Sequence, residues 1–293
     1  MDIPALDAFV AVASSGSFSD ASQNLHITQP AVSKRVALLE SQLGARLFDR
    51  VGRQVILTEA GQTLLPRARH ILAEAQNAIR ALNNLKGDVG GTFTLGTSHH
   101  VGLHRLPPAL RTYSARYPQV NLDLRFLDSE QACLLVTRGE LELALVTLPD
   151  RLADELVATP VWHDRLRVAL SIDHPLATRS AITLGDLAKH AAILPPPGSF
   201  TRELIDRLFA TQGLKIQARM STHYLETIKM MVSVGLGWSV LPETMLDTQT
   251  VGRVIDGTPM QRELGVVQHV RRTPSNAGLA MLALLRERGD DPY

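Results

Sequence analysis

Apolar side chains near the start of the chain recur at the three- and four-residue spacing of an α-helix, at Ile3, Leu6, Phe9, Val10 and Ala13. This pattern predicts a first helix that ends at the sequence SSGS. Ser17 and Thr28 are placed to cap a short second helix and a longer third helix, which has Pro30 in its first turn. The third helix has its own apolar stripe, at Val32, Val36, Leu39 and Leu43.

After Gly44 the helical spacing gives way to short β-prone stretches. The sequences ARLFDR and QVILT flank Gly52, which predicts a hairpin with this glycine in the turn. Helix, short helix, tight turn, longer helix and hairpin is the order of a winged helix-turn-helix, in which the later helix can enter a DNA major groove. We therefore expect a DNA-binding domain over residues 1–58.

A long stretch follows in which Gly61 and Pro66 are the main helix breakers, and it predicts a linker helix over residues 59–87. Its apolar positions alternate between spacings of four and three, at Leu64, Ala68, Ile71, Ala75, Ala78, Leu82 and Leu85. That spacing is a heptad seam, which favours pairing with the same helix of a second copy. The alternative is a single helix that lies on its own domain.

From residue 91 onward, β-rich stretches alternate with helical ones. TFTLGTS, VNLDLRFL and LELALVT are expected strands, and one helix is expected over residues 103–118 with Pro107 and Pro108 near its start. Alternation of this kind predicts an α/β architecture with a largely parallel sheet or sheets. The pattern alone leaves one sheet and two lobes open.

The composition is that of a globular protein, with 45% hydrophobic and 20% charged residues. The first residues include acids where a secretory signal needs basic ones, and no stretch approaches the roughly 20 apolar residues of a membrane span. We therefore expect a cytoplasmic protein without a membrane partner. The single cysteine, Cys133, excludes an intrachain disulfide and is expected to be buried.

Positive charge is concentrated in one segment of the chain. The net charge is only +1, but residues 28–69 hold seven basic and three acidic side chains and carry +4, which leaves the remainder at about −3. The polar face of the third helix begins with Gln29, Ser33 and Lys34, residue types that bind base edges or phosphates. A solvated charged helix beside a hairpin is the alternative.

The sequence SFSDASQNLHITQPAVSKRVALLESQLGARLFDRVGRQVILTEAGQTLL, from Ser17 to Leu65, resembles the N-terminal signature of LysR-type transcriptional regulators. The resemblance implies a homodimer or homotetramer that binds double-stranded DNA under the control of a small-molecule effector. It also implies an α+β multidomain chain with a winged helix-turn-helix, a linker helix and a two-lobed effector domain like periplasmic binding proteins. The first lobe would comprise residues 91–161 with 268–288, and the second residues 162–267.

The same resemblance implies which residues contact DNA. Side chains at the start of the third helix would meet bases and phosphates in the major groove, and two arginines of the wing would enter the flanking minor groove. The expected DNA-binding residues are Ser17, Ser19, Thr28, Gln29, Pro30, Ser33, Lys34, Arg50 and Arg53.

Effector-binding candidates follow from the ends of the expected strands, because ligands of open α/β sheets bind there, near helix N-termini. The candidates, which the resemblance also places along the effector cleft, are Thr97, Ser98, His99, His100, Thr147, Ser199, Phe200, Thr201, Thr222, His223 and Tyr224. Hydroxyls and imidazoles suit a small anion such as a carboxylate, and the two aromatic rings suit an apolar portion. Helix capping by Ser199 and Thr201 and a structural role for His223 are the alternatives.

We expect neither a metal nor another cofactor. His100 and His104 are four residues apart and can share a helix face, but no cysteine is near them, Pro107 and Pro108 crowd the segment, and no glutamate follows in a zinc-protease pattern. The sequence also has no GxSxG, P-loop or GxGxxG motif between a strand and a helix. We interpret the chain as a regulator and not an enzyme. One alternative is a DNA-binding head fused to an α/β enzyme-like domain, and a second is a structural dimer that binds DNA without a ligand.

Overall fold

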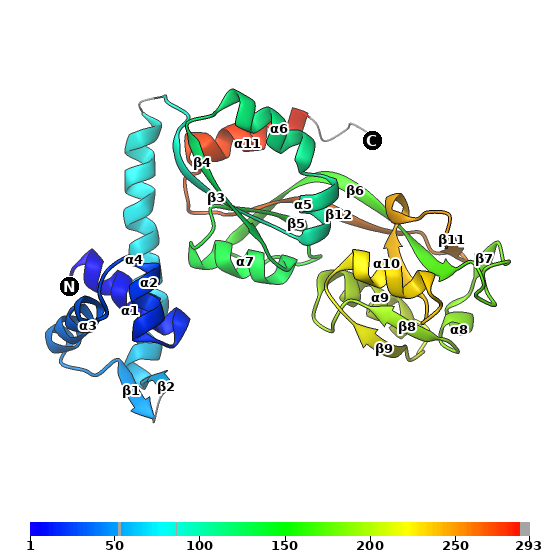
Figure 1. Ribbon diagram of the computed structural model, residues 1–293, viewed down its shortest axis with the longest axis horizontal. Coiled ribbons are helices and arrows are strands. Elements are labelled where there is room, and N and C mark those ends of the chain that lie inside the picture. The colour runs from blue at the N-terminus through cyan, green and yellow to red at the C-terminus, as the bar shows by residue number, and fades with distance from the viewer. Residues whose placement is uncertain (52–53, 86, 288–293) are drawn as a thin grey trace. The chain divides into compact units, whose positions relative to one another are not determined.

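The computed structural model describes residues 1–51, 54–85 and 87–287 (Figure 1). The chain divides into two compact units, Met1–Lys86 and Gly87–Tyr293, and each has a hydrophobic core of its own. Among the described helices, none is both long enough and apolar enough to cross a membrane.

The first unit has the predicted order of elements: α1 (Ile3–Ser15), α2 (Phe18–Asn24), α3 (Gln29–Leu43), β1 (Phe48–Val51), β2 (Gln54–Leu57) and α4 (Glu59–Asn84). The Asp2 side chain accepts a hydrogen bond from Ala5 N at 2.8 Å and caps α1. Ser17 accepts one from Asp20 N at 3.2 Å and caps α2, as predicted. Thr28 holds the N-cap position of α3, but its hydroxyl caps none of the described backbone amides.

Three phenylalanines join the helices of this unit to the hairpin. Phe48 of β1 packs against Phe9 of α1 and Phe18 of α2, with ring centroids 5.4 and 5.8 Å apart. Glu40 of α3 accepts hydrogen bonds from the backbone amides of Leu47, at 2.7 Å, and Phe48, at 3.3 Å. α3 therefore fixes where the wing hairpin, β1 and β2, begins.

The apolar stripe of α3 is shorter than predicted. Val32, Val36 and Leu39 are buried, whereas Leu43 is 43% exposed. Leu43 is the last residue of the helix and lies in a surface hollow with Ala45, so its inclusion in the core stripe was wrong.

α4 begins where the chain passes very close to the start of the wing. Thr58 caps the helix by accepting from Gly61 N at 3.0 Å. A Cβ at Gly61 would lie 2.2 Å from the Leu47 carbonyl oxygen, so only glycine fits at this position. The helix ends at Asn84, a little before the predicted residue 87.

The heptad seam of α4 divides into two parts. Leu64, Ala68 and Ile71 pack into the core of their own unit, as the single-helix alternative requires. Leu82 and Leu85 are 66% and 83% exposed, so the apolar second half of the seam faces solvent in the single chain.

The second unit begins with β3 (Gly91–Thr97), α5 (His99–His104), α6 (Pro107–Arg116), β4 (Val120–Phe126), α7 (Ser129–Arg138), β5 (Leu143–Thr147), β6 (Leu156–Ser171), β7 (Ala181–Ile182) and α8 (Leu184–Leu187). It continues with β8 (Ala191–Leu194), α9 (Phe200–Ala210), β9 (Gln217–Ser221), α10 (Leu225–Ser233), β10 (Ser239–Pro242), a 3-10 turn (Glu243–Met245), β11 (Thr250–Ile255), β12 (Met260–His269) and α11 (Asn276–Glu287). The single helix expected over residues 103–118 is wrong, because the Pro107–Pro108 pair starts α6 as a new helix and leaves α5 separate.

One sheet of mixed direction runs through this unit, in the order β4-β3-β5-β12-β6-β11-β7, with β10 also paired to β6. β3 is parallel to β4 and β5, but β12 is antiparallel to both β5 and β6. The prediction of a largely parallel sheet or sheets was therefore wrong for this sheet, whereas β8 and β9 form a separate sheet that is parallel. The reason is that two long strands, β6 and β12, return against each other and connect the lobes (Figure 1).

Each lobe has apolar clusters on its part of the sheet. In lobe 1, α6 and α11 lie together on one face and α7 covers the other (Figure 1). In lobe 2, α9 packs through Phe209 onto Trp238, whose ring is stacked 5.7 Å away, and α10 forms a second cluster. The chain returns to lobe 1 through β12, which pairs with β5, and α11, which packs in the same cluster.

The lobes meet at an irregularity in the β6–β12 pair. The register shifts between Leu264 and Gly265. A Cβ at Gly265 would lie 2.4 Å from the Thr159 carbonyl oxygen, so the close approach requires glycine. Residues Leu264 to Gln268 pair with β5, so β12 belongs to the sheet of lobe 1 from Leu264 onward.

Candidate functional site

The first candidate site is the start of α3. Thr28, Gln29, Pro30 and Lys34 are exposed, and Ser33 is half-buried on the same face. Gln29 Nε2 donates to Ser33 Oγ at 3.2 Å, so the two side chains form one polar surface. This surface lies opposite the buried stripe of the helix and offers donors and acceptors to a groove.

The other predicted DNA contacts lie around this helix or outside the described side chains. Ser17 is half-buried at the cap of α2, and Ser19 is exposed in its first turn. The backbone of Arg50 lies in β1, opposite Val55 of β2. Arg53 falls outside the described residues.

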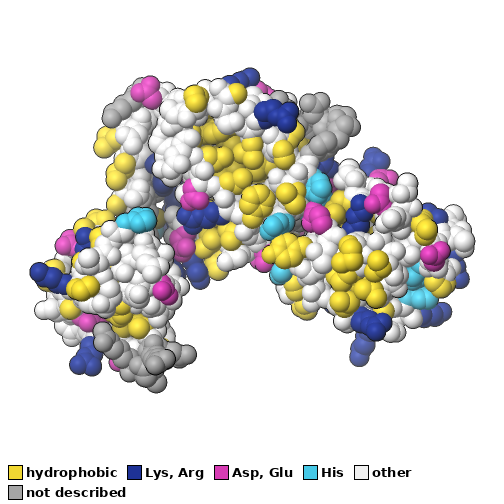
Figure 2. Space-filling model, viewed as in Figure 1, with side chains coloured by type: hydrophobic (Ala, Val, Ile, Leu, Met, Phe, Trp, Pro, Cys, Tyr) yellow, Lys and Arg dark blue, Asp and Glu magenta, His cyan; other side chains and the backbone are white. Residues whose placement is uncertain are grey.

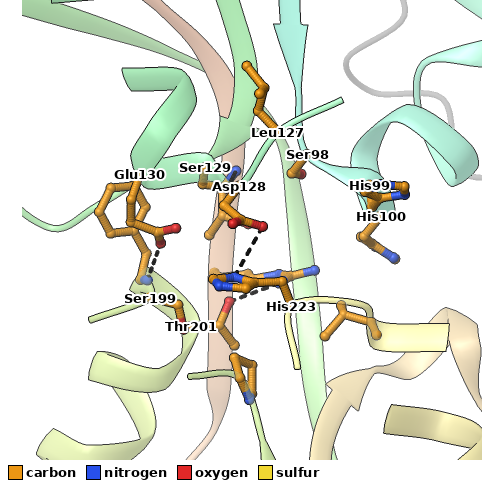
Figure 3. Close-up of a pocket in the computed structure, with 15 residues that line it drawn as sticks. Ser98, His99, His100, Leu127, Asp128, Ser129, Glu130, Ser199, Thr201 and His223 are labelled. Atoms are coloured by element: carbon orange, nitrogen blue, oxygen red, sulfur yellow. Dashed lines mark hydrogen bonds and ion pairs between the residues drawn. The ribbon is translucent and has the colours of Figure 1, made fainter. Parts of the chain in front are cut away.

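The second candidate site is a pocket where helices from both lobes begin. α5 and α7 of lobe 1 and α9 and α10 of lobe 2 all start beside it, and β12 crosses it (Figure 3). The pocket encloses about 50 Å³, which is room for a few water molecules or a small polar group. Helix N-termini carry unpaired amides and partial positive charge, so their convergence favours an anion.

Glu130 of lobe 1 binds one of these helix N-termini. Its Oε1 accepts a hydrogen bond at 2.5 Å from the backbone amide of Phe200, the first residue of α9 in lobe 2. Beside it, Asp128 Oδ1 lies 3.1 Å from His223 Nδ1, and Figure 3 shows these two side chains pointing toward each other across the pocket. The two carboxylates of lobe 1 therefore hold two segments of lobe 2.

Two more side-chain pairs join the lobes at the other edge of the pocket. The rings of His99 and Tyr224 meet edge to face, with centroids 4.6 Å apart. His104 Nε2 lies 2.8 Å from Glu226 Oε1. Figure 2 shows imidazole and carboxylate side chains gathered where the lobes meet.

A buried carboxylate, Asp164, lies behind the pocket. Asp164 on β6 and Arg262 on β12 are opposite each other in the strand register, and their closest N···O distance is 2.9 Å. Arg105 donates to the other carboxylate oxygen at 2.7 Å. Burial alone would raise the pKa of Asp164, but the adjacent His100, Arg262 and Arg105 outweigh burial and hold this pKa well below its usual value.

Arg262 joins the buried carboxylate of Asp164 to the wall of the pocket. Burial is the main cause that lowers its pKa, and Asp164 opposes that effect by stabilising the charged form. Arg262 Nη1 donates to the hydroxyl of Thr201 at 3.0 Å, in the first turn of α9. The guanidinium thus connects the charge of Asp164 to the helix end that Glu130 binds.

His100 is buried beside this network, with 5% of its surface exposed. Its Nε2 lies 3.3 Å from Asp164 Oδ2, but off the hydrogen-bonding direction, and neither ring nitrogen has a hydrogen-bond partner among the described residues. Burial is the largest influence on His100 and lowers its pKa, which favours the neutral ring.

The structure brings most of the predicted effector residues together. Those that line the pocket are Ser98, His99, His100, Thr147, Ser199, Phe200, Thr201 and His223. Thr97 is fully buried instead, and its hydroxyl donates to the Leu145 carbonyl at 2.9 Å. Thr222 accepts from the amide of Tyr224 at 3.3 Å, and both residues lie beside the pocket without lining it.

Four charged residues of the site were not predicted from the sequence: Asp128, Glu130, Asp164 and Arg262. A signal for two of them is present, because Asp164 and Arg262 occupy positions in β6 and β12 whose alternate neighbours, such as Trp162 and Leu264, are buried. A charged residue in the buried phase of a strand indicates an internal ion pair. Asp128 and Glu130 at the start of α7 look like ordinary acids of a first helical turn.

Comparison with known proteins identifies the family of each unit. Residues 3–62 match the family described as bacterial regulatory helix-turn-helix protein, lysR family, and residues 86–290 match the LysR substrate binding domain. The chain belongs to the LysR family of transcriptional regulators. As such a regulator it binds DNA, takes a small-molecule effector in its two-lobed domain, and forms oligomers.

Individual relatives match the whole or part of the LysR-type chain. A probable RuBisCO transcriptional regulator of Synechocystis sp. is 33% identical over 284 residues, which are 93% of this chain and 82% of that protein. An uncharacterized HTH-type transcriptional regulator of Azotobacter vinelandii is 66% identical over 108 residues, 37% of this chain and 75% of the relative. Full-length OxyR from Pseudomonas aeruginosa has the same fold, with a TM-score of 0.75 at 23% identity, covering 98% of this chain and 95% of the other. The match to regulators decides against the enzyme alternative.

The Asp164 network yields a prediction about stability. Asp164→Asn leaves Arg105 and Arg262 without their buried counter-charge, and we expect it to destabilise the effector unit by about 3–5 kcal/mol in chemical unfolding. Asp123→Asn, which breaks the exposed pair with Arg125, should cost at most about 1 kcal/mol.

The free energy of unfolding that Asp164 contributes should fall as the pH is lowered. Because the pKa of Asp164 is lowered on folding, its contribution is fully present above the usual aspartate pKa and disappears only as the pH falls through the lower folded value. Equal losses for the two substitutions at neutral pH would contradict the assignment of a buried network.

Proposed function

We propose that this LysR-type regulator responds to a small anion of the carboxylate class that replaces Glu130 at the N-terminus of α9. The observation that carries the proposal is the 2.5 Å hydrogen bond from Phe200 N to the Glu130 carboxylate. A carboxylate already occupies the position that a helix N-terminus prepares for an anion, so a carboxylate ligand makes the same contact.

The surroundings of this position supply further partners for an anion. Arg262 is held against Thr201 in the same helical turn, and His223 lies across the pocket from α7. The hydroxyl of Ser98 is buried and has no hydrogen-bond partner among the described residues, which leaves it available for a polar group of the ligand. The half-buried ring of Phe200 supplies an apolar wall.

A protein of the same fold has been solved with a ligand of this chemical class. The effector binding domain of QuiR was determined in complex with shikimate, which is a carboxylate, and it aligns with a TM-score of 0.62 over 68% of this chain. Similarity at 20% identity shows the shared fold, so the carboxylate class for this chain rests on Glu130 and the α9 N-terminus.

Replacement of Glu130 would change how the lobes hold each other. The stabilisation from the Glu130 contact is lost when the effector takes its place. The ligand then favours the lobe arrangement that it contacts best. Asp128–His223 and His104–Glu226 are the neighbouring contacts that this shift would strain.

On the DNA side, we propose that the exposed face of α3 reads the operator, with residues 1–58 as the DNA-binding domain and the linker helix as a dimer contact. Gln29, positioned by Ser33, is assigned to a base edge, and Lys34 to a phosphate. The wing arginines Arg50 and Arg53 are assigned to the minor groove, as the family resemblance implies.

The DNA assignment predicts two different losses. Lys34→Ala should weaken binding to all sequences and reduce the slope of log K against log salt by about 1. Gln29→Ala should remove about 1–3 kcal/mol of discrimination at one base position and leave the salt slope unchanged. Gel-shift titrations of the operator and a scrambled duplex at several salt concentrations measure both quantities. Lys215→Ala and Gln212→Ala, on the exposed surface of lobe 2, are the matched controls, and identical results for all four variants would refute the assignment.

The effector assignment is tested with benzoate and its neutral isostere benzamide on metal-free protein. Benzoate should raise the melting temperature, and benzamide should do so much less, because only the carboxylate can accept from the α9 amide with charge assistance. Glu130→Gln removes the competing carboxylate. Since a charged hydrogen bond exceeds a neutral one by about 1 kcal/mol, this variant should bind benzoate about fivefold more tightly.

Glu203→Gln is the matched control for that experiment. It removes the same charge from the first turn of α9, but Glu203 is exposed and is not the acceptor of the Phe200 amide, which is Glu130. A general charge effect would tighten binding equally in both variants, and that result would contradict the proposal.

A further inference from the structure

His100, His104 and Glu226 form a cluster at the edge of the interlobe pocket. Each offers one donor atom, and these atoms all lie within 4.8 Å of one another. The two histidines lie on successive turns of α5 in lobe 1, with ring centroids 5.0 Å apart. The glutamate lies in the first turn of α10 in lobe 2. The third donor was missing from the sequence pattern because it comes from more than a hundred residues away.

The buried member of this cluster is not satisfied by protein contacts. Both ring nitrogens of His100 are buried without a hydrogen-bond partner among the described residues. A buried imidazole with two unpaired nitrogens loses the hydrogen bonds that water would provide. Asp164 Oδ2 lies 3.3 Å from Nε2, so Nδ1 is the ring nitrogen that no described side chain approaches as a partner.

A divalent metal ion is a partner that matches this set of donors. Two imidazoles and one carboxylate are the protein ligands of zinc sites that keep a fourth position open. At zinc–ligand distances of roughly 2.0–2.2 Å, neighbouring donors in a tetrahedron are about 3.4 Å apart. The 2.8 Å between His104 Nε2 and Glu226 Oε1 and the 4.8 Å limit of the cluster lie on either side of that value.

The surroundings of His100 fit the same chemistry. Asp164 Oδ2 lies 3.3 Å from His100 Nε2, off the hydrogen-bonding direction. With the metal on Nδ1, this carboxylate is beside the second ring nitrogen, as is common for metal-bound histidines. Asp164 is fixed in this position by Arg105 and Arg262, so its orientation does not depend on the histidine.

We propose that His100, His104 and Glu226 bind one divalent transition-metal ion of the zinc class, which joins lobe 1 to lobe 2. This site goes beyond the anion site at α9. No metal was expected from the sequence, because no third ligand lies near the two histidines along the chain. Glu226 supplies that third ligand from lobe 2, so the expectation changes. Because the ligands come from both lobes, the ion stabilises the lobe arrangement in which α5 meets α10.

The test uses the full chain, stripped of metal with a chelator and then titrated with Co²⁺ and Zn²⁺ alone. We expect one equivalent of Co²⁺ to produce the visible absorption of a tetrahedral site, Zn²⁺ to displace it, and Zn²⁺ to raise the melting temperature. His104→Ala and Glu226→Gln should each weaken metal binding by at least about 100-fold, more than the loss of an outer-sphere partner causes. Both side chains are partly exposed, so neither substitution should unfold the protein.

His163→Ala is the matched control, because His163 faces Glu263 as an exposed pair at 3.8 Å on β6 and β12. The control should bind the metal like the unsubstituted chain. Absence of the cobalt absorption in the unsubstituted chain, or equal binding by the unsubstituted chain, His104→Ala and Glu226→Gln, would overturn the proposal. The assay contains no anion or DNA, so its failure would leave the anion site and the DNA-binding face unaffected.

Discussion

The arrangement of the effector unit depends on one buried ion pair, between Asp164 on β6 and Arg262 on β12. These two strands are the longest of the sheet and the ones that connect the lobes, and the pair is in direct register across them. A charge pair inside a protein is favourable only when its geometry and remaining hydrogen bonds are satisfied. Arg105 and Thr201 complete those bonds, so α5, β6, β12 and α9 must keep their relative positions.

This constraint explains why the pocket lies where it does. The fixed framework brings the start of α9 next to the start of α7, and Glu130 then reaches the amide of Phe200. In the proposed mechanism, the contact at this point is made by a carboxylate that the effector replaces, whereas the pair behind it is buried. A regulator needs both kinds of interaction, because a ligand shifts the equilibrium only through contacts that differ between states.

The sequence predicts the local elements better than the connections between them. Caps, helical spacing and the wing hairpin were readable because their signals lie within a few residues, as at Ser17 and along α3. The antiparallel return of β12 along β6 was not, since its partner is about a hundred residues away. The exposed Leu43 and the buried Thr97 show the same limit, because their burial is decided by which other element covers them.

Some residues of the pocket could likewise be predicted from the sequence and others could not. Hydroxyls and histidines at strand ends could be predicted, because helix starts have a recognisable composition. Glu130, Asp128 and Glu226 could not, because each acts on the opposite lobe. An acid in a first helical turn looks the same whether it interacts with its own helix dipole or crosses a cleft to another.

A crystal structure of the full chain with benzoate would test the central claim most directly. The account predicts that the benzoate carboxylate accepts the hydrogen bond from the Phe200 amide and that the Glu130 side chain has left α9, while Asp164 and Arg262 remain paired. Benzoate bound elsewhere, with Glu130 still on the Phe200 amide, would contradict it.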